Sequence, residues 1–322
     1  MATRRRVIAA LGLGLAAPGA VLGQAVRAAG APGGMAQAQA ALPHRVVLPG
    51  VGTDGPRPAV RLSFRTPFQG GAIYLEVDHA VTAAARAFGR VSPLSPGPRG
   101  VEGFVGFGVA DPPGPAVLEV TATDAVGGTF RFSEPITVRA TQWTWDDIWL
   151  PPPDPNAPPP EGPPLEPEQP RLDALYATVT PRQWQLPFII PIELGGEVWV
   201  SGYFGEQRSF NGGPRTGHHG GTDIAAPAGT PVRSTNHGTV VLSELTLVRG
   251  NLVVVDHGGG VLSCYGHLSQ RSVEVGQAVR RGDVVGRVGS TGLSSGPHLH
   301  WELSVAGVLV DGLRWLDGTQ GF

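Results

Sequence analysis

The segment Gly296-Pro-His-Leu-His-Trp-Glu-Leu303 decides the fold of the second half of the chain. Polar and apolar side chains alternate through it, and on a β-strand successive side chains point to opposite faces. The expected faces are His298, His300 and Glu302 on one side, and Leu299, Trp301 and Leu303 on the other. Two imidazoles side by side on a rigid strand suit a zinc site. A pair of hydrogen-bonded polar histidines is the alternative that this motif leaves open.

A second segment, His219-Gly-Gly-Thr-Asp223, spaces a histidine and a carboxylate four residues apart. The two glycines inside it disfavour a helix, so we expect a bent, extended segment. Imidazole and carboxylate are both zinc ligands. Alone, this pair is weak evidence for a zinc site. It becomes stronger evidence together with the histidines of the strand at 298–300.

The third segment is Val261-Leu-Ser-Cys-Tyr-Gly-His267. Residues 251–256 and 261–266 are expected to form strands joined by the hairpin turn His257-Gly-Gly-Gly260. Strict alternation places His267 on the face opposite to Cys264, which excludes a catalytic pair between them and makes the thiol a small core residue. The other nearby histidines (His218, His237 and His257) are expected to have structural or surface roles.

The composition excludes several classes of protein. The chain has 322 residues, a net charge of −2, 48 Gly and 32 Pro, which favours turn-rich β structure over helix bundles. All 24 basic residues are Arg. Without lysine, Schiff-base, pyridoxal-phosphate and Walker-type chemistry is excluded. The near-neutral charge gives no footprint for nucleic acid, and the single cysteine allows no intrachain disulfide.

The N-terminus has the pattern of an export signal. Three arginines (residues 4–6) precede the uncharged run Val7–Val26, and small residues follow at 36–40. This order predicts a signal peptide over residues 1–40, of ordinary secretory or twin-arginine type. We therefore expect a mature chain without an integral membrane span, located in the periplasm, the cell envelope or the medium.

The rest of the chain divides into three parts, and the fold class is mainly β. Residues 43–149 contain short β-rich runs, such as 59–64, 73–77, 117–122 and 129–138, typical of an immunoglobulin-like sandwich. Residues 150–182 form a Pro-rich linker with a short helix near 171–178. Strand-length apolar runs resume from 183 to 322, the expected second domain.

Several segments together resemble the lysostaphin-type (LytM-type) zinc endopeptidases, which cut peptide bonds in bacterial cell walls. The matching motifs are Val200-Ser-Gly-Tyr-Phe-Gly205, the segment 219–232, Gly250-Asn-Leu-Val-Val-Val-Asp-His257-Gly, Tyr265-Gly-His267 and the segment 289–300. They occur in the family's order over about 120 residues. The departures are Cys264, where a hydroxyl residue is common, and Asp311-Gly312, where Asp-Pro is common.

The resemblance implies a small antiparallel β domain and assigns roles to five residues. His219, Asp223 and His300 would bind one zinc ion per chain, and His267 and His298 would be the catalytic histidines. Three protein ligands leave the fourth tetrahedral position for water, as in catalytic zinc sites. The implied substrate is a stem or cross-bridge peptide of peptidoglycan. Glu302 is a rival general base, for which we prefer a role in orienting a ligand.

Two other functions are considered. Some members of this family are non-catalytic activators of wall amidases or wall-binding modules, but the presence of all five residues favours the enzyme. The segment Val275–Gly286 resembles the strand–turn–strand of a biotinyl or lipoyl carrier. Such carriers need a lysine, which this chain lacks.

Overall fold

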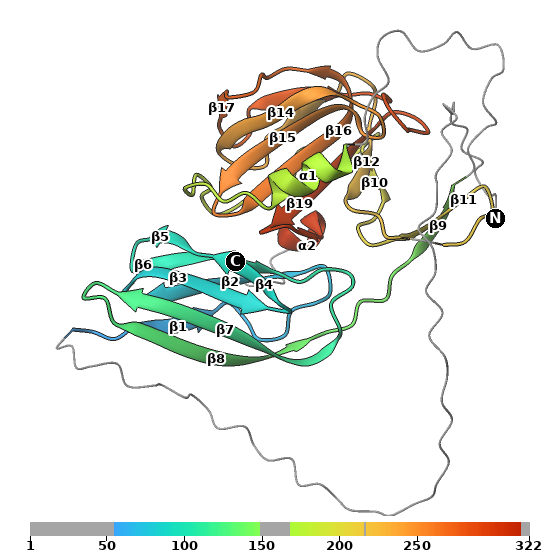
Figure 1. Cartoon of the computed structure of the whole chain (residues 1–322). Coiled ribbons are helices and arrows are strands. Elements are labelled where there is room, and N and C mark those ends of the chain that lie inside the picture. Colours follow the sequence, from blue (N-terminus) through green and yellow to red (C-terminus); the bar gives the residue numbers. More distant parts are fainter. Residues whose placement is uncertain (1–54, 149–167, 216, 317–322) are drawn as a thin grey trace, which may run out of the picture.

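The computed structural model describes residues 55–148, 168–215 and 217–316. The predicted signal peptide and most of the Pro-rich segment lie outside these residues. The described part is mainly β, as the composition predicts (Figure 1). None of its helices is long and apolar enough to cross a membrane.

The N-terminal domain consists of two four-stranded antiparallel sheets packed face to face. The first has the order β1 (Ala59–Leu62), β2 (Ala72–Asp78), β6 (Gly100–Gly106) and β5 (Ser95–Gly97). The second has the order β4 (Arg90–Pro93), β3 (Ala80–Ala87), β7 (Gly114–Asp124) and β8 (Thr129–Val138). Inward side chains of both sheets, such as Leu75 and Leu118, form one core. The expected strands are confirmed in position, whereas the immunoglobulin-like topology stays a prediction.

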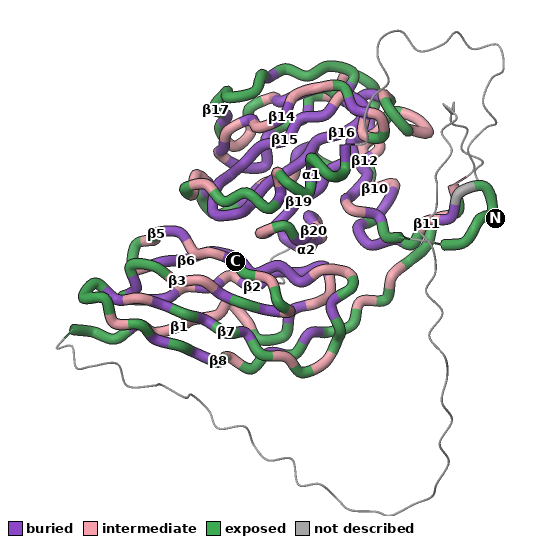
Figure 2. The backbone as a smooth tube through the Cα atoms, in the orientation of Figure 1, coloured by how far each residue is buried: buried purple, intermediate pink, exposed green. Residues whose placement is uncertain are grey.

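The C-terminal domain is built on a ten-stranded sheet. Its main path runs through β10 (Trp199–Gly202), β12 (Thr222–Ala225), β19 (His298–Val305), β16 (Val261–Arg271), β15 (Gly250–Gly258), β14 (Gly238–Thr246) and β17 (Ala278–Val279). The branches are β13 (Pro231–Arg233), β18 (Val284–Val288) and β20 (Val308–Val310). Figure 2 shows that the central strands are almost continuously buried.

Both faces of this sheet are covered. Ile224, Leu299 and Trp301 point into a core on one face. On the other face lies α1 (Gln169–Tyr176), whose Leu172 and Tyr176 pack on strands β14, β15 and β16. The helix predicted near 171–178 is therefore present, and it packs as part of the C-terminal domain.

The two domains share an aromatic interface. The ring of Phe104 on β6 lies 4.9 Å from that of Trp184 and 4.4 Å from that of Trp315 on α2 (Gly312–Leu316), measured between centroids. Phe188 joins the same cluster, and Arg182 forms an ion pair with Glu102. In Figure 1, α2 lies between the two bodies. The N-terminal domain is thus packed on the C-terminal one.

A second connection lies to the side of this interface. β9 (Trp145–Ile148) leaves the N-terminal domain and pairs in parallel with β11 (Gln207–Phe210), which belongs to the loop before His219. The Trp143 ring packs on Phe204, with 6.1 Å between centroids. A Cβ at Gly205 would collide with the Trp143 ring, so only glycine allows this approach. The residues after the sandwich therefore support the loop that leads into the histidine motif.

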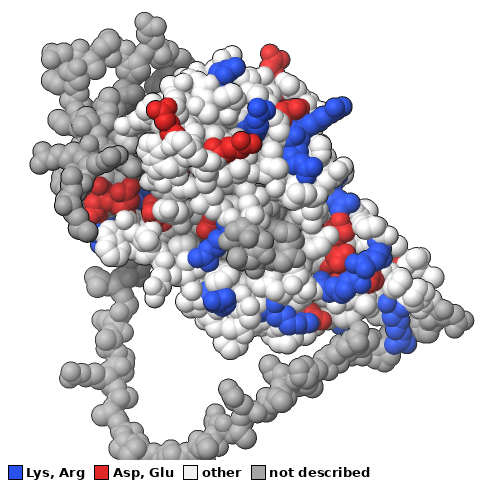
Figure 3. Space-filling model, turned by 180° about the vertical axis from the view of Figure 1, so that it is seen from behind, with Lys and Arg blue, Asp and Glu red and all other residues white. Residues whose placement is uncertain are grey.

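Both acidic and basic side chains are scattered over the face drawn in Figure 3, and several groups of opposite sign touch. Ion pairs among the described residues include Arg65 with Glu134 at 2.7 Å and Arg99 with Glu76 at 2.8 Å. Exposed pairs of this kind contribute little to stability, about 0–1 kcal/mol each.

Candidate metal centre

His219 and Asp223 are brought together by the bend between them. His219 precedes β12, and its backbone N–H donates to the carbonyl of Glu206 at 2.8 Å. A Cβ on Gly221 would collide with the carbonyl oxygen of Trp301, so glycine is required for the chain to pass this close to β19. His219 Nε2 and Asp223 Oδ1 lie 3.2 Å apart. The bent, extended conformation expected of this segment is confirmed.

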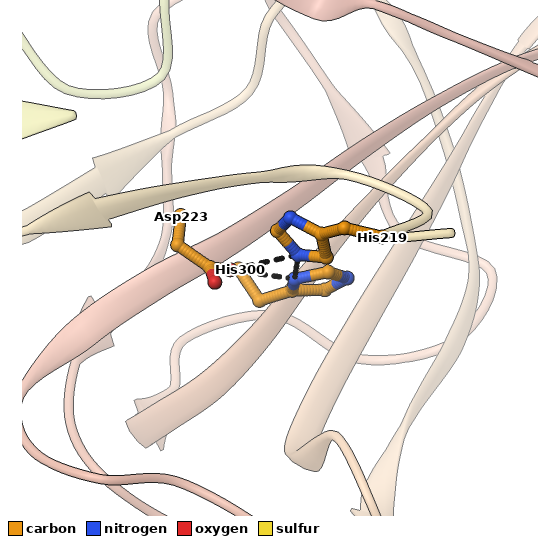
Figure 4. A group of neighbouring side chains, drawn as sticks. All are labelled: His219, Asp223 and His300. Carbon is orange, nitrogen blue, oxygen red and sulfur yellow. Dashed lines mark hydrogen bonds and ion pairs between the residues drawn. The ribbon is translucent and has the colours of Figure 1, made fainter. Parts of the chain in front are cut away.

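His300 completes the group from the neighbouring strand. β12 and β19 are antiparallel, and Asp223 is directly opposite His300. His300 Nδ1 lies 2.8 Å from Asp223 Oδ1 and 3.1 Å from His219 Nε2. Figure 4 shows the three side chains converging on one point. All three are buried, with 5–8% of their surface exposed.

The remaining polar atoms of these three side chains are held by other groups. His219 Nδ1–H donates to the carbonyl of Tyr203 at 2.9 Å, and His300 Nε2–H donates to Glu302 Oε1 at 2.8 Å. These bonds fix the tautomers, so His219 Nε2 and His300 Nδ1 each present a lone pair to the other. Asp223 Oδ2 accepts from Arg208 at 2.6 Å, which leaves Oδ1 facing the two nitrogens.

Three lone pairs that converge in this way need a cation. Zinc binds nitrogen and carboxylate oxygen at about 2.0–2.1 Å, so tetrahedral ligands lie about 3.3 Å from one another. The three distances here, 2.8, 3.1 and 3.2 Å, are close to that spacing. Outer partners that orient each ligand are also typical of zinc sites. The donor set therefore fits a zinc ion with three protein ligands.

His298 and His267 lie next to this group. The His267 and His298 rings are 4.6 Å apart between centroids, and His298 Nε2 is 3.8 Å from Asp223 Oδ1. Each ring is anchored through Nδ1, His267 by the carbonyl of Thr291 and His298 by that of Gly296, both at 2.8 Å. Their Nε2 atoms therefore carry the free lone pairs.

Strict alternation along β16 was the wrong expectation for His267. Glu302 pairs with Cys264, so the metal face of β19 continues through Cys264 and Gly266, while Tyr265 points into the opposite core. His267 adopts a positive φ of 59°, where non-glycine residues are uncommon. This turn places its ring beside His298, on the metal side of the sheet.

Cys264 and His267 are thus not separated by opposite faces. The thiol is excluded as a nucleophile for a different reason: it is fully buried, and burial raises its pKa well above the usual range. A thiol that remains protonated is inert. The prediction that Cys264 is a core residue is confirmed, together with the partition of β19 into a polar and an apolar face.

Burial also determines the protonation of the histidines. It lowers the pKa of His267 to about 3, helped by the neighbouring His298 and His300, and it lowers the pKa of His298 and His219 as well. For His300, burial alone would lower the pKa, but hydrogen bonds to Asp223 and Glu302 raise it. Asp223 is ionised, because the facing histidines keep its pKa low despite burial. The two flanking histidines are therefore neutral at pH 7.

Sequence reasoning missed three residues that support the site. Arg208 binds Asp223, and Arg249 donates to Glu302 through Nε at 2.7 Å and Nη2 at 2.6 Å. The Tyr176 hydroxyl donates to Glu302 Oε2 at 2.6 Å. Burial alone would raise the pKa of Glu302, but these partners hold it at about 2. Glu302 therefore orients His300 and is not free to act as a base.

The remaining histidines of this region lie outside the group. His257 is fully buried, donates through Nδ1 to the carbonyl of His237 and accepts at Nε2 from Ser263. His218 packs against the Trp143 ring. The structural role expected for His257 is confirmed.

Comparison with known proteins shows which family the C-terminal domain is similar to. Residues 217–312 match the profile of Peptidase family M23. The chain is 41% identical over 115 residues to the Peptidoglycan DD-endopeptidase ShyA of Vibrio cholerae, a match that covers 36% of this chain and 27% of that protein. It is 47% identical over 89 residues to the DD-carboxypeptidase/endopeptidase Mpg of Neisseria meningitidis serogroup B, covering 28% and 20% respectively. The chain therefore spans only about a quarter or a fifth of these relatives.

A solved structure covers more of the chain. A crystal structure described as a "putative peptidase M23" from Pseudomonas aeruginosa superposes with a TM-score of 0.53 and 27% identity, over 78% of this chain and 94% of that one. The fold and the donor set define a β domain with a buried His/Asp/His group that can hold a metal ion. The C-terminal domain is similar to Peptidase family M23 over residues 217–312, and the resemblance to lysostaphin-type peptidases is confirmed.

Proposed function

We propose that this protein is an exported zinc endopeptidase that hydrolyses peptide bonds in the stem or cross-bridge peptides of peptidoglycan. One observation carries the proposal: three lone pairs converge on a cation site beside two neutral histidines. The family, and relatives named as peptidoglycan DD-endopeptidases, support the substrate class.

His219, Asp223 and His300 would hold one zinc ion through Nε2, Oδ1 and Nδ1. A bound zinc ion supplies a Lewis acid that polarises the scissile carbonyl and makes water a better nucleophile at neutral pH. Asp223 offers a single oxygen, because Arg208 occupies the other. Three ligands in this arrangement leave room for a further ligand on the metal.

The two flanking histidines, His267 and His298, would accept the proton of the attacking water and stabilise the negative charge that develops on the oxyanion. Both are neutral, with Nδ1–H fixed on backbone carbonyls, so each Nε2 can accept a proton from the attacking water. A histidine that has taken up this proton can return it to the leaving amine, or donate a hydrogen bond to the oxyanion. The positive φ at His267 and the strand position of His298 fix both rings before substrate binds.

The division of roles is tested by zinc content and activity in single variants. Asp223→Ala and His300→Ala are expected to lose zinc and hydrolysis of purified peptidoglycan together, since two remaining ligands hold the ion weakly. His267→Ala and His298→Ala are expected to keep zinc but to lose about 10²–10⁴-fold in rate. Loss of zinc from His298→Ala, with zinc retained in His300→Ala, would reverse the assignment.

Metal dependence tests the class of function. We expect about one zinc per chain, with activity removed by a chelator and restored by zinc. Full hydrolysis by metal-free protein would refute the mechanism. Zinc-loaded protein that is inert on every type of wall would favour a non-catalytic activator or wall-binding module.

Export is a further part of the proposal. Secreted material is expected to begin between Ala38 and Leu42, after the small-residue sites. N-terminal sequencing decides this, and an intact Met1 in the envelope would contradict cleavage.

A further inference from the structure

On the face of the sheet that carries the metal centre, the surface is covered on the Glu302 side of His300 and open on the His298 side. Along β19, Glu302 and His298 lie two residues on either side of His300 and share its face. Glu302 is 1% exposed, because Tyr176 of α1 and Arg249 cover it. His298 is only partly buried. A polypeptide bound at the metal centre can therefore continue past His298 but not past Glu302.

A row of three residues crosses the sheet on this open side. In the register, His298 is opposite Ala225 on β12, and Ala225 is opposite Trp199 on β10. Directly opposed residues of antiparallel strands point to the same face. Ile224 and Leu299 fill the core behind the sheet, so their neighbours Ala225 and His298 face the metal side. The side chain of Trp199 faces that side too.

Trp199 is suited to bind a ligand. It is 51% exposed, and β10 ends the path of strands in the described part of the sheet. Ala225 is the residue between Trp199 and His298 in this row. Because its side chain is a single methyl group, no large side chain of the row separates the indole from His298. A large exposed aromatic ring supplies rigid apolar contact area at low entropic cost.

The spacing identifies what the ring would contact. Adjacent strands lie about 4.8 Å apart, so Trp199 is about 10 Å from His298 along the row. An extended peptide advances about 3.3 Å per residue, so this distance corresponds to about three residues. We propose that Trp199 forms a binding subsite for the aliphatic part of a substrate peptide, about three residues from the scissile bond. This inference rests on the proposed endopeptidase function.

The test compares the zinc-loaded full chain with Trp199→Ala and Trp199→Phe. The probe is the cross-linked muropeptide dimer released from purified peptidoglycan by a glycan hydrolase, used before and after removal of its sugars. Covering about 100 Å² of apolar ring supports an effect on the order of 10- to 50-fold. We expect Trp199→Ala to raise KM by that factor with little change in kcat and unchanged zinc content, and Trp199→Phe to recover part of the loss.

A matched control is Leu245→Ala, which truncates another exposed apolar side chain (50%) on the same sheet, at β14. It should leave KM unchanged. An unchanged KM in Trp199→Ala would overturn the subsite. An effect that disappears when the sugars are removed would show that the ring binds glycan and would overturn the peptide assignment.

Direct binding of the same dimer, measured by calorimetry, separates the subsite from the proposed function. If the wild type binds but does not cleave, and Trp199→Ala weakens binding 10- to 50-fold, the endopeptidase proposal fails and the subsite stands. If the wild type cleaves and Trp199→Ala binds as well as the wild type, the subsite alone fails. If the wild type neither binds nor cleaves the dimer, both fail.

Discussion

Replacing Glu302 by glutamine is expected to weaken zinc binding without unfolding the site. Among the residues that the structure describes, Glu302 is the acceptor for His300 Nε2–H, at 2.8 Å. Its Oε1 also accepts from Arg249, and its Oε2 accepts from the Tyr176 hydroxyl. Glutamine has the same shape: its oxygen can still accept from His300 and Arg249, and its amide can donate to the tyrosine. The substitution therefore removes the negative charge and little else.

The expected loss of zinc affinity follows from the position of the Glu302 carboxylate, which contacts His300 rather than the metal itself. A carboxylate that accepts from a metal-binding histidine makes the opposite nitrogen a better donor, and its loss typically costs 10- to 100-fold in metal affinity. This corresponds to about 1.4–2.7 kcal/mol of binding free energy. Glu302→Ala should cost more stability, about 3–5 kcal/mol, since it leaves the buried guanidinium of Arg249 without this partner.

Zinc affinity is measured by competition with a chromophoric chelator, and stability by thermal unfolding of the metal-free protein. The matched control is Glu168→Gln. Glu168 is equally buried and also binds Arg249, with Oε1 3.0 Å from the backbone nitrogen, but it does not contact His300. It should lower stability while changing zinc affinity by less than about threefold. Wild-type affinity in Glu302→Gln, or an equal loss in Glu168→Gln, would refute the reasoning.

Three further predictions concern the rest of the molecule. Burial lowers the pKa of His257 from its usual 6.5 to about 4. As pH falls, this histidine is therefore protonated in the unfolded chain before it is protonated in the folded one. Its contribution to the free energy of unfolding falls by about 3 kcal/mol between pH 6.5 and pH 4. Unfolding midpoints across this range should show a smaller fall in His257→Gln, and an unchanged fall would contradict the shift. Trp143→Ala should lower both kcat and zinc affinity by loosening the loop that carries Arg208, whereas Val126→Ala, at an exposed turn, should not. The fragment 183–322 should aggregate or bind a hydrophobic dye, since it lacks Phe104 and α1, and soluble, fully active fragment would show that neither is needed.

Much of the site could be predicted because its pattern is local. The alternation along β19 needs only the two-residue period of a strand, so it places His298, His300 and Glu302 on one face without knowledge of the fold. The bend at His219–Asp223 follows from its two glycines in the same way. The predicted division into zinc-binding and catalytic histidines comes from the resemblance to the family, because alternation alone cannot distinguish these roles.

The position of His267 could not be predicted from the period of a strand. Alternation fails where the backbone leaves the β region, and the positive φ at this residue depends on contacts outside the strand. Its N–H donates to the carbonyl of Arg249 at 2.6 Å, and its ring to that of Thr291, 24 residues further along the chain. Only the fold brings these groups together.

The packing of the segment between the two domains could also not be predicted from the sequence. A Pro-rich stretch followed by apolar runs predicted a linker with a short helix over residues 150–182 and a second domain from residue 183. In the structure, α1 covers the ten-stranded sheet of the C-terminal domain, and Arg182 binds Glu102 of the N-terminal domain. Trp184 and Phe188, at the start of the predicted second domain, pack on Phe104 of the N-terminal domain, and no local pattern in the sequence indicates this contact.

The two arginines that sequence reasoning missed perform the same task on the two carboxylates of the site. Arg208 takes one oxygen of Asp223 and leaves the other for the metal. Arg249 binds Glu302, whose same oxygen also accepts from His300. The planar guanidinium donates in fixed directions, so it orients a carboxylate as well as keeping it ionised, which the point charge of a lysine does less well. The carbonyl of Arg249 also accepts the N–H of His267, so one residue positions both Glu302, the partner of His300, and the proposed catalytic histidine His267. The geometry of the candidate metal centre thus depends on side chains outside the His/Asp/His group. These belong to β11 and to the residue just before β15, which the histidine motifs do not include.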